Sequence, residues 1–451
     1  MQDLTNGSLT AHLVRTSTFM LVSMVFQTLY VLVDLYWVGR LGTEAVAAVG
    51  VSSNLMFVVL GATQMLGVGT TALVSHAVGR KDRPRALRVF NQSQVLSLGV
   101  GGLFLVIAMA LRKTYAAGLS ADAATMKLVS DYLLWFIPAL ALQFAMVSMG
   151  AAMRGSGNFK PGMVVQIATV VINMALAPIL IFGWGTGVPL GVAGAAIATL
   201  IAIAIGVTWM ATYFVTSSAY LRFDLHAWRP EPRLWRKILA IGLPAGAEFA
   251  LTAVYLVIVY SVARPFGAAA QAGFGIGLRL MQACFLPVVA LGFAVAPVAG
   301  QNFGARRGDR VRATFSAAAK IVIPAMLVLA IALQVAAEPL IAIFTADRAA
   351  IAVGRDYLRI IAWNFVPSGL IFVSSSMFQA MGNALPSLVT SFARIVCVAV
   401  PTIWISTRPG FELRTVWYLS VASVGLQLAL NLWLLRREFR TRLDFQPIAT
   451  V

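Results

Sequence analysis

Apolar residues run along this chain in long blocks, and short clusters of glycine, proline and charged residues separate one block from the next. A helix needs about 20 apolar residues to cross the roughly 30 Å hydrocarbon core of a bilayer, and it satisfies its own backbone hydrogen bonds there. The blocks therefore predict an all-α polytopic membrane protein with about twelve transmembrane helices. They cover residues 14–38, 46–76, 89–111, 128–152, 161–183, 190–216, 238–263, 269–299, 313–335, 351–380, 387–407 and 414–435.

The composition supports this fold class. Of the 451 residues 60% are hydrophobic and 11% are charged, whereas soluble domains carry about 25% charged residues. A net charge of +18 is typical of nucleic-acid binders. Here, however, the basic residues lie in short loops, so no nucleic-acid partner is expected. The two cysteines, Cys284 and Cys397, lie in apolar blocks and indicate reduced packing residues rather than a disulfide or metal framework.

One polar and basic interior loop divides the chain into halves. It predicts an N-lobe over residues 1–216, a cytoplasmic linker over 217–237 and a C-lobe over 238–451. Lys and Arg are roughly twice as numerous in the loops on the N-terminal side of the membrane as on the other side, which predicts that both termini are cytoplasmic. The first block is longer than a signal-peptide core and lacks a cleavage site. We therefore expect a multi-pass protein of the cell (inner) membrane.

Short motifs recur in the two halves at a spacing of about 225 residues. The repeated pairs are Gly79-Arg-Lys-Asp-Arg with Gly304-Ala-Arg-Arg-Gly-Asp-Arg, Asp131-Tyr-Leu133 with Asp356-Tyr-Leu358, and Gly157-Asn158 with Gly382-Asn383. Each repeat holds an even number of spans, so both enter the membrane from the same side. The pattern predicts two six-helix bundles related by a pseudo-two-fold axis along the membrane normal, with a cleft between them, as is typical of alternating-access carriers.

Asp34 lies inside the first apolar block. On a helix it shares a face with Ser23, Gln27 and Tyr30. A carboxylate within a transmembrane helix costs about 2.5–3.5 kcal/mol on insertion scales and usually faces a cavity or takes up a proton or cation. The alternative is an interfacial aspartate that reaches water, since Arg40 follows closely. We interpret Asp34 as a coupling residue.

Only one other of the sixteen acidic residues falls inside a predicted span. Glu248 lies one turn after Pro244, with Thr252 and Tyr255 on the same helical face. These residues predict a second, weaker site for substrate or coupling. The alternative is a hydrated acid near the cytoplasmic end of its span.

Polar residues also gather in the fifth and sixth spans. Gln166, Thr169 and Asn173 share one face of the fifth span, and Thr199 lies among small residues in the sixth, where helices approach closely. Packing between helices is the ordinary role of such residues. Together with Asp34 they indicate a proton or cation pocket.

Nothing in the sequence indicates an enzyme. The glycines of Gly273-Phe-Gly-Ile-Gly277 lack the strand and lysine of a nucleotide-binding loop and are interpreted as helix packing. There is no pattern of a catalytic triad, an ATPase or a zinc site. We therefore expect secondary transport with no cofactor other than a coupling ion.

Several motifs, taken in order, resemble the multidrug and toxic compound extrusion (MATE) family over nearly the whole chain. They are Val33-Asp-Leu-Tyr-Trp-Val-Gly-Arg-Leu-Gly42, Met153-Arg-Gly-Ser-Gly-Asn-Phe-Lys-Pro161, Gly242-Leu-Pro244, Gly300-Gln-Asn-Phe-Gly304 and Gln379-Ala-Met-Gly-Asn-Ala-Leu-Pro386. The resemblance implies twelve helices in two lobes. It also implies export of cationic or amphiphilic organic compounds in exchange for protons or sodium. The family's N-lobe cation site maps onto Tyr30, Asp34, Asn173 and Thr199, of which Asp34, Asn173 and Thr199 are the candidate sodium ligands.

Three features depart from the family pattern. Ala177 stands where the family often has a second aspartate in the fifth span, which favours protons over sodium as the coupling ion. The early proline of the first span is absent from residues 13–38. Glu248 lies one turn after Pro244, whereas the acid of that span usually lies about two turns after the proline.

Two other classes of carrier remain as alternatives. The basic loops also resemble those of major-facilitator carriers, although that class does not explain the Gly-Asn-x-x-Pro pair. A lipid-linked-precursor flippase would need a cationic cavity, for which Arg279 is the main candidate. For the leading interpretation, a multidrug antiporter, we expect small organic substrates that are cationic or amphiphilic, a lipid environment and a monomer.

Overall fold

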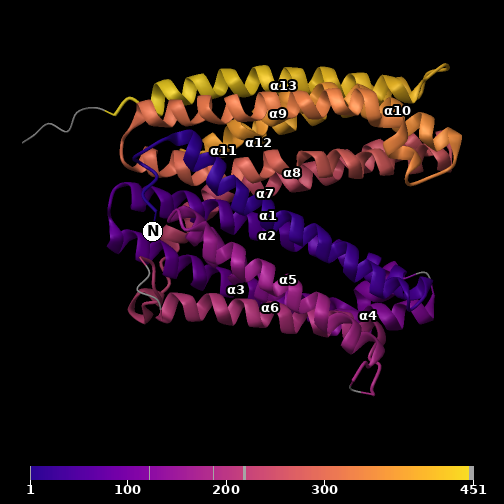
Figure 1. Ribbon diagram of the computed structural model, residues 1–451, viewed down its shortest axis with the longest axis horizontal. Coiled ribbons are helices and arrows are strands. Elements are labelled where there is room, and N and C mark those ends of the chain that lie inside the picture. The colour runs from indigo at the N-terminus through magenta and orange to yellow at the C-terminus, as the bar shows by residue number, and fades with distance from the viewer. Residues whose placement is uncertain (1, 121, 186, 217–219, 446–451) are drawn as a thin grey trace, which may run out of the picture. The chain divides into compact units, whose positions relative to one another are not determined.

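The computed structural model describes residues 2–120, 122–185, 187–216 and 220–445, and within these ranges the regular structure is entirely helical. The α-helices are α1 (Leu9–Gly39), α2 (Thr43–Gly79), α3 (Arg83–Leu119), α4 (Ala123–Gly155), α5 (Phe159–Phe182), α6 (Gly191–Thr216), α7 (Pro232–Ala263), α8 (Ala268–Gly304), α9 (Gly308–Ala342), α10 (Arg348–Ile361), α11 (Phe365–Ala380), α12 (Leu385–Ser406) and α13 (Leu413–Arg442). Three short 3-10 helices lie between them, η1 (Leu225–Trp228), η2 (Arg264–Phe266) and η3 (Ala362–Asn364). Figure 1 labels the α-helices in place.

Twelve segments of the described chain are long and apolar enough to cross a membrane, which confirms the predicted fold class. Large apolar side chains on their surfaces are freely exposed, for example Phe57 (72%) and Val335 (77%). Exposure of this kind would be costly in water and is expected where lipid is the solvent.

One predicted helix is interrupted. The block at residues 351–380 forms α10 and α11, with η3 between them. Pro367 has no backbone N–H to donate to the carbonyl of Trp363, and its ring clashes with that carbonyl, so the helix tightens there. The corresponding helix of the first half, α4, stays continuous through Pro138.

The chain divides into two compact units. Unit 1 comprises residues 1–3 and 18–243, and unit 2 comprises residues 4–17 and 244–451. Both divisions fall inside helices, because α1 and α7 each contribute residues to both units. The lobe boundaries expected at residues 216/217 and 237/238 stay a prediction.

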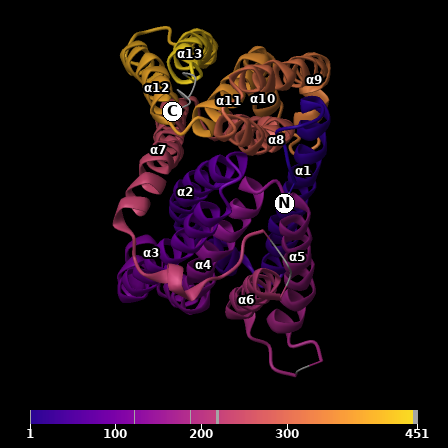
Figure 2. The ribbon, with the colours of Figure 1, turned by 90° about the vertical axis from the view of Figure 1, so that its left-hand side faces the viewer.

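Unit 1 is built around α4, which packs against α2, α3 and α6, while α5 packs on α6 (Figure 2). Small residues allow these approaches, as expected for the sixth span. A Cβ on Gly194 would lie 2.5 Å from the carbonyl oxygen of Leu180, and a Cβ on Gly155 would lie 2.9 Å from that of Thr71. Larger side chains would force the helices apart.

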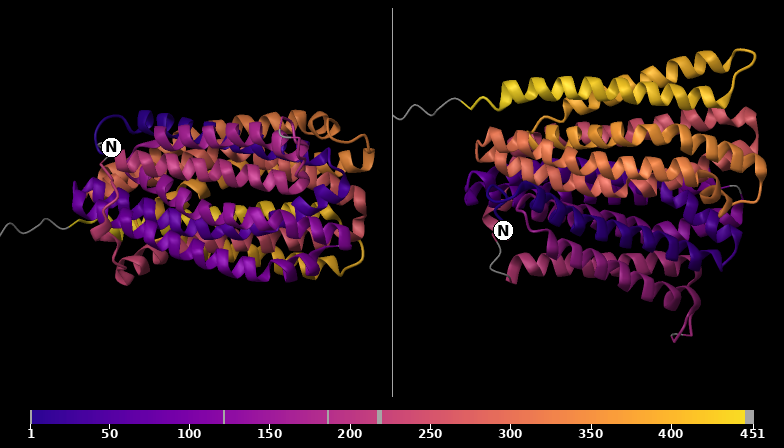
Figure 3. Two further views of the ribbon diagram at one scale, coloured as in Figure 1. Left: turned by 90° about the horizontal axis from the view of Figure 1, so that it is seen from below. Right: turned by 45° about the horizontal axis from the view of Figure 1, so that its top comes forward.

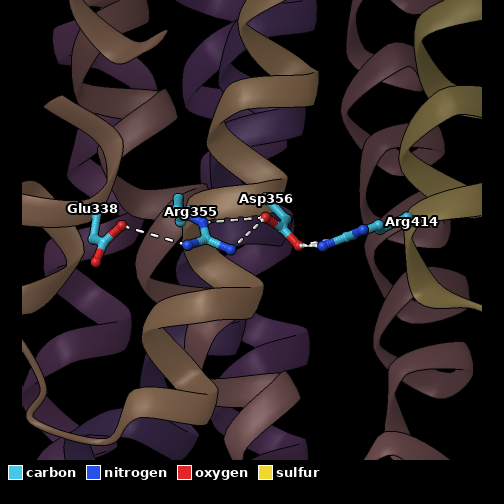
Figure 4. Close-up of polar contacts among 4 residues, drawn as sticks. All are labelled: Glu338, Arg355, Asp356 and Arg414. Atoms are coloured by element: carbon cyan, nitrogen blue, oxygen red, sulfur yellow. Dashed lines mark hydrogen bonds and ion pairs between the residues drawn. The ribbon is translucent and has the colours of Figure 1, made fainter. Parts of the chain in front are cut away.

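Unit 2 is organised around α8, which packs against α9, α10 and α11, with α13 against α10, α11 and α12; its helices run lengthwise beside one another in Figure 3. A charged network around the middle of α10 joins α10 to α9 and α13 (Figure 4). Asp356 accepts hydrogen bonds from Arg414 at 2.8 and 2.5 Å and from Arg355 at 3.2 Å. Arg355 also reaches Glu338 of α9 at 3.4 Å.

The sequence repeat is also a repeat of backbone conformation. Helices α2 and α8 end with a lysine or arginine in the left-handed region, Lys81 (φ 60°) and Arg306 (φ 57°). Helices α4 and α11 end with glycines in the same region, Gly157 (φ 77°) and Gly382 (φ 76°). All four ends carry the paired hydrogen bonds of a Schellman motif, for example Asp82 N to Ala77 O and Arg307 N to Asn302 O.

The segment predicted as a linker is held against unit 1 by two buried amides of α3. Gln92 donates to the carbonyls of Ala227 and Arg229 at 2.6 Å, and its Oε1 accepts from Trp235 Nε1 at 2.8 Å. Asn91 binds the chain around Arg222 and Trp228 in the same way. The described part of the linker is therefore packed structure rather than a free connection.

Candidate functional site

Three helices of unit 1 bring together three of the four residues assigned to the N-lobe cation site. Asn173 of α5 donates from Nδ2 to Oγ1 of Thr199 on α6 at 3.0 Å, and the hydroxyl of Tyr30 on α1 lies 3.2 Å from the same oxygen. Asn173 is 3% exposed and Thr199 is 5% exposed. The site is buried, and its polar atoms bind one another.

The hydrogen-bond directions in this cluster follow from the chemistry of a hydroxyl group. Thr199 donates its one proton to the carbonyl of Ala195 at 3.1 Å. Its two lone pairs then accept from Asn173 and from Tyr30, so Tyr30 is the donor. Thr199 Oγ1 is fully used by protein groups, and a cation that bound there would have to displace one of them.

Asp34 lies beside this cluster and is 8% exposed. It interacts electrostatically with Tyr30, one turn away on α1, and with Tyr132 of α4. Its Oδ1 atom is buried and has no hydrogen-bond partner among the described residues. A buried carboxylate oxygen without a donor is costly unless it takes up a proton or a cation. Asp34 is thus the group in the cluster that is suited to take up a charge.

Sequence reasoning did not single out Tyr132, the buried tyrosine of α4 that interacts electrostatically with Asp34. It is 2% exposed and lies in the repeated Asp131-Tyr-Leu133 motif. The sequence did offer a signal, because Tyr132 is a polar aromatic residue within a repeated motif. That motif served only to align the two halves of the chain.

Other candidates of unit 1 do not join the cluster. Gln27 is exposed, and the hydroxyl of Thr169 donates to Val165 O of its own helix at 2.8 Å. Ala177, which stands in place of the family's second acid, is 1% exposed. This position is therefore buried and carries no polar atom.

In unit 2, Glu248 of α7 accepts a short hydrogen bond from Ser387 of α12, and Ser375 of α11 lies 2.6 Å from the Ser387 oxygen. Two turns further along α7, the hydroxyl of Tyr255 lies 3.2 Å from that of Ser420 on α13. Thr252 is exposed, and its hydroxyl donates to the Glu248 carbonyl. The structure joins Glu248 and Tyr255 to a polar seam between helices and leaves Thr252 outside it.

This polar seam contains a cation that sequence reasoning missed. Arg394 lies near the middle of α12, its guanidinium carbon is 5.3 Å from the centre of the Tyr255 ring, and its Nε atom is buried without a partner among the described residues. Arg279, the cation that sequence reasoning proposed, is exposed on α8. The available signal was spacing, since Arg394 follows Ser387 by seven residues, as Tyr255 follows Glu248.

Among the described residues, no group of three or more His, Cys, Asp or Glu side chains is placed to hold a metal ion. A cation bound at the unit 1 cluster would have Asp34 as its one carboxylate ligand. The remaining ligands would be neutral oxygens.

Comparison with known proteins agrees with this architecture. Residues 20–179 and 244–405 match the family model described as MatE. The chain is 25% identical to "Multidrug export protein MepA" of Staphylococcus aureus, over 92% of each chain. It is 24% identical to "FAD transporter" of Shewanella oneidensis, over 82% of each chain. A solved outward-facing structure of a multidrug resistance MATE family transporter superposes with a TM-score of 0.90 at 24% identity, over 98% of each chain.

Proposed function

This chain belongs to the MatE family, whose members are transporters and not enzymes, and from that premise we propose that it is a secondary multidrug efflux antiporter. It would export cationic or amphiphilic organic compounds by alternating access, in exchange for protons. The family match sets aside the major-facilitator and flippase alternatives. The observation that carries the coupling proposal is the buried Oδ1 atom of Asp34, which has no hydrogen-bond partner among the described residues and lies one turn from Tyr30 on α1.

Protons fit this cluster better than sodium. Thr199 Oγ1 already accepts two hydrogen bonds and donates one, and Ala177 supplies no second carboxylate. Sodium, a hard cation, needs several oxygen ligands, whereas a proton needs only the free oxygen of Asp34. Export is driven only if the coupling ion and the substrate oppose each other's binding. Protonation of Asp34 would provide this opposition by removing the charge that attracts a cationic substrate.

The test is export of a fluorescent organic cation from proteoliposomes under a pH gradient or a sodium gradient, each imposed alone. We expect transport under the pH gradient and its loss in Asp34→Asn, with Asp131→Asn as the matched control because Asp131 is an exposed acid of the same unit. Full pH-driven export by Asp34→Asn would disprove the role of Asp34. Transport under sodium alone would replace the proton with sodium as the coupling ion.

Arg394 favours a second class of substrate, which is anionic and aromatic. A guanidinium over a tyrosine ring at mid-helix depth can bind a phosphate or carboxylate beside a stacked ring. One relative, from Shewanella oneidensis, is named as a transporter of FAD, a molecule that carries a diphosphate and aromatic rings. Parallel assays with an organic cation and with a flavin nucleotide would separate the two classes, and Arg394→Gln should impair only flavin transport.

A further inference from the structure

An open groove of about 390 Å³ lies on the surface of unit 1, between α2, α3 and α4. Its lining is apolar over most of its length, with residues such as Val58, Leu103 and Ile107, which are about half exposed or more. Arg112 and Tyr115 lie along the same groove. The groove is therefore apolar along most of its length, and its lining includes one cationic side chain, Arg112.

Helix packing explains one end of the groove. At Gly101, α3 and α4 touch, because a Cβ on this residue would lie 2.9 Å from the carbonyl oxygen of Ala141 and 3.3 Å from the Cβ of Phe144. From Val100 to Arg112 the groove follows α3 for twelve residues, or about 18 Å at 1.5 Å per residue. This length is close to one leaflet of hydrocarbon, about 15 Å.

The position of Arg112 along α3 corresponds to headgroup depth. The helix carries no polar residue from Leu98 to Leu111, and Arg112 and Lys113 follow directly. Residue 101 is the midpoint of α3, so Arg112 lies about 16 Å from the midpoint along the axis. If the midpoint lies near the bilayer centre, Arg112 meets the boundary between acyl chains and headgroups.

Arg112 also has unused hydrogen-bonding capacity. Its Nε and Nη1 atoms are buried and have no acceptor among the described residues. Tyr115, which lines the same groove, points its hydroxyl proton elsewhere, since this group donates to Val51 O at 2.8 Å. Buried guanidinium nitrogens without an acceptor are costly, and phosphate is the anion that arginine pairs with best.

We propose that this groove is a binding site for a membrane phospholipid, with one acyl chain along α3 and the phosphate paired with Arg112. Charge complementarity and the leaflet-length apolar groove select a phospholipid over a free anion or an apolar molecule. The site is separate from the Asp34 cluster and does not depend on the coupling ion.

The test measures binding to delipidated full-length protein in detergent, from the shift in melting temperature on titration. The probes are phosphatidylglycerol, diacylglycerol (chains without phosphate) and glycerol 3-phosphate (phosphate without chains). We expect binding of phosphatidylglycerol, and at least about tenfold weaker binding of the other two. Equal binding of diacylglycerol would show a site for apolar molecules only, and equal binding of glycerol 3-phosphate would show an anion site only. Either result overturns the proposal.

Four variants extend the test. Arg112→Gln should weaken phosphatidylglycerol binding at least about tenfold, and Ile107→Trp should weaken it by filling the groove. Lys113→Gln, which removes an exposed neighbouring charge, should leave binding unchanged. Arg112→Lys keeps a cation at this position, so the folded variant should keep part of the affinity for phosphatidylglycerol. This result would show that Arg112→Gln loses binding through its missing charge and not through misfolding. Unchanged binding by folded Arg112→Gln, or dimers that bury the groove, would overturn the proposal.

Discussion

The backbone amide of Leu4 donates a 3.0 Å hydrogen bond to Oε1 of Gln301 on α8. Asn302 donates in return to the Leu4 carbonyl at 3.2 Å, and Leu4 is 0% exposed. The side-chain amides of Gln301 and Asn302 both belong to the Gly300-Gln-Asn-Phe-Gly304 motif. That motif, recognised in the sequence by resemblance alone, thus has a structural role in holding the segment before α1 within unit 2.

Arg307→Ala should loosen this N-terminal segment. Arg307 Nη1 donates to Thr5 O at 2.6 Å and to Asn6 Oδ1 at 3.1 Å. Loss of charge-assisted hydrogen bonds costs about 1.5–3 kcal/mol, so hydrogen exchange of residues 4–8 should speed up about 10–100-fold. Arg437→Ala, on the exposed side of α13, is the control and should change nothing there. Equal protection in both variants would contradict the assigned role.

Gln92→Ala should release the linker from unit 1. The Gln92 side chain is 0% exposed and binds the linker at Ala227, Arg229, Glu231 and Trp235. Without it, several backbone groups lose their partners. Limited trypsin digestion should then cut faster at Arg222, which precedes Phe223. Gln94→Ala is the control, because this buried amide of the same helix binds Ser93 and Ser148 instead. Digestion at the wild-type rate would show that other contacts hold the linker.

Thr199→Val should destabilise unit 1 by about 1–2 kcal/mol, because Asn173 and Tyr30 both lose their shared acceptor. Thermal unfolding in detergent measures the loss. Thr208→Val on the same helix is the matched control, since this exposed hydroxyl donates only to Ala204 O. The proposed donor arrangement predicts a lower melting temperature for Thr199→Val alone. If the two variants have the same melting temperature, the shared acceptor contributes no stability.

Glycine should stabilise the two repeat-related turns at Lys81 and Arg306. A side chain in the left-handed region costs about 1–2 kcal/mol relative to glycine, part of which is offset by the greater freedom of glycine in the unfolded chain. Lys81→Gly and Arg306→Gly should each raise the melting temperature, whereas Gly157→Ala, at φ 77°, should lower it. A fall in melting temperature for both glycine variants would mean that contacts of the replaced side chains outweigh the backbone strain.

Periodic features were predictable from the chain alone. Blocks of about 20 apolar residues identify membrane helices because no other backbone arrangement satisfies its hydrogen bonds within a single segment in lipid. The recurrence at about 225 residues identified turns that the structure forms twice, since glycine and polar residues at fixed helix ends specify those turns locally. Asp34 was also recognisable from the sequence, because it is a charged residue within an apolar block.

Only tertiary packing decided which polar residues meet. Spacing along α1 placed Gln27 and Tyr30 on one face, but Tyr30 reaches Thr199 while Gln27 is exposed. Tyr132, Arg394 and the amides of Asn91 and Gln92 acquire their roles from helices or segments that are distant in sequence. Each partner is set by how helices cross, which depends on many small approaches such as that at Gly194, and no short motif records them.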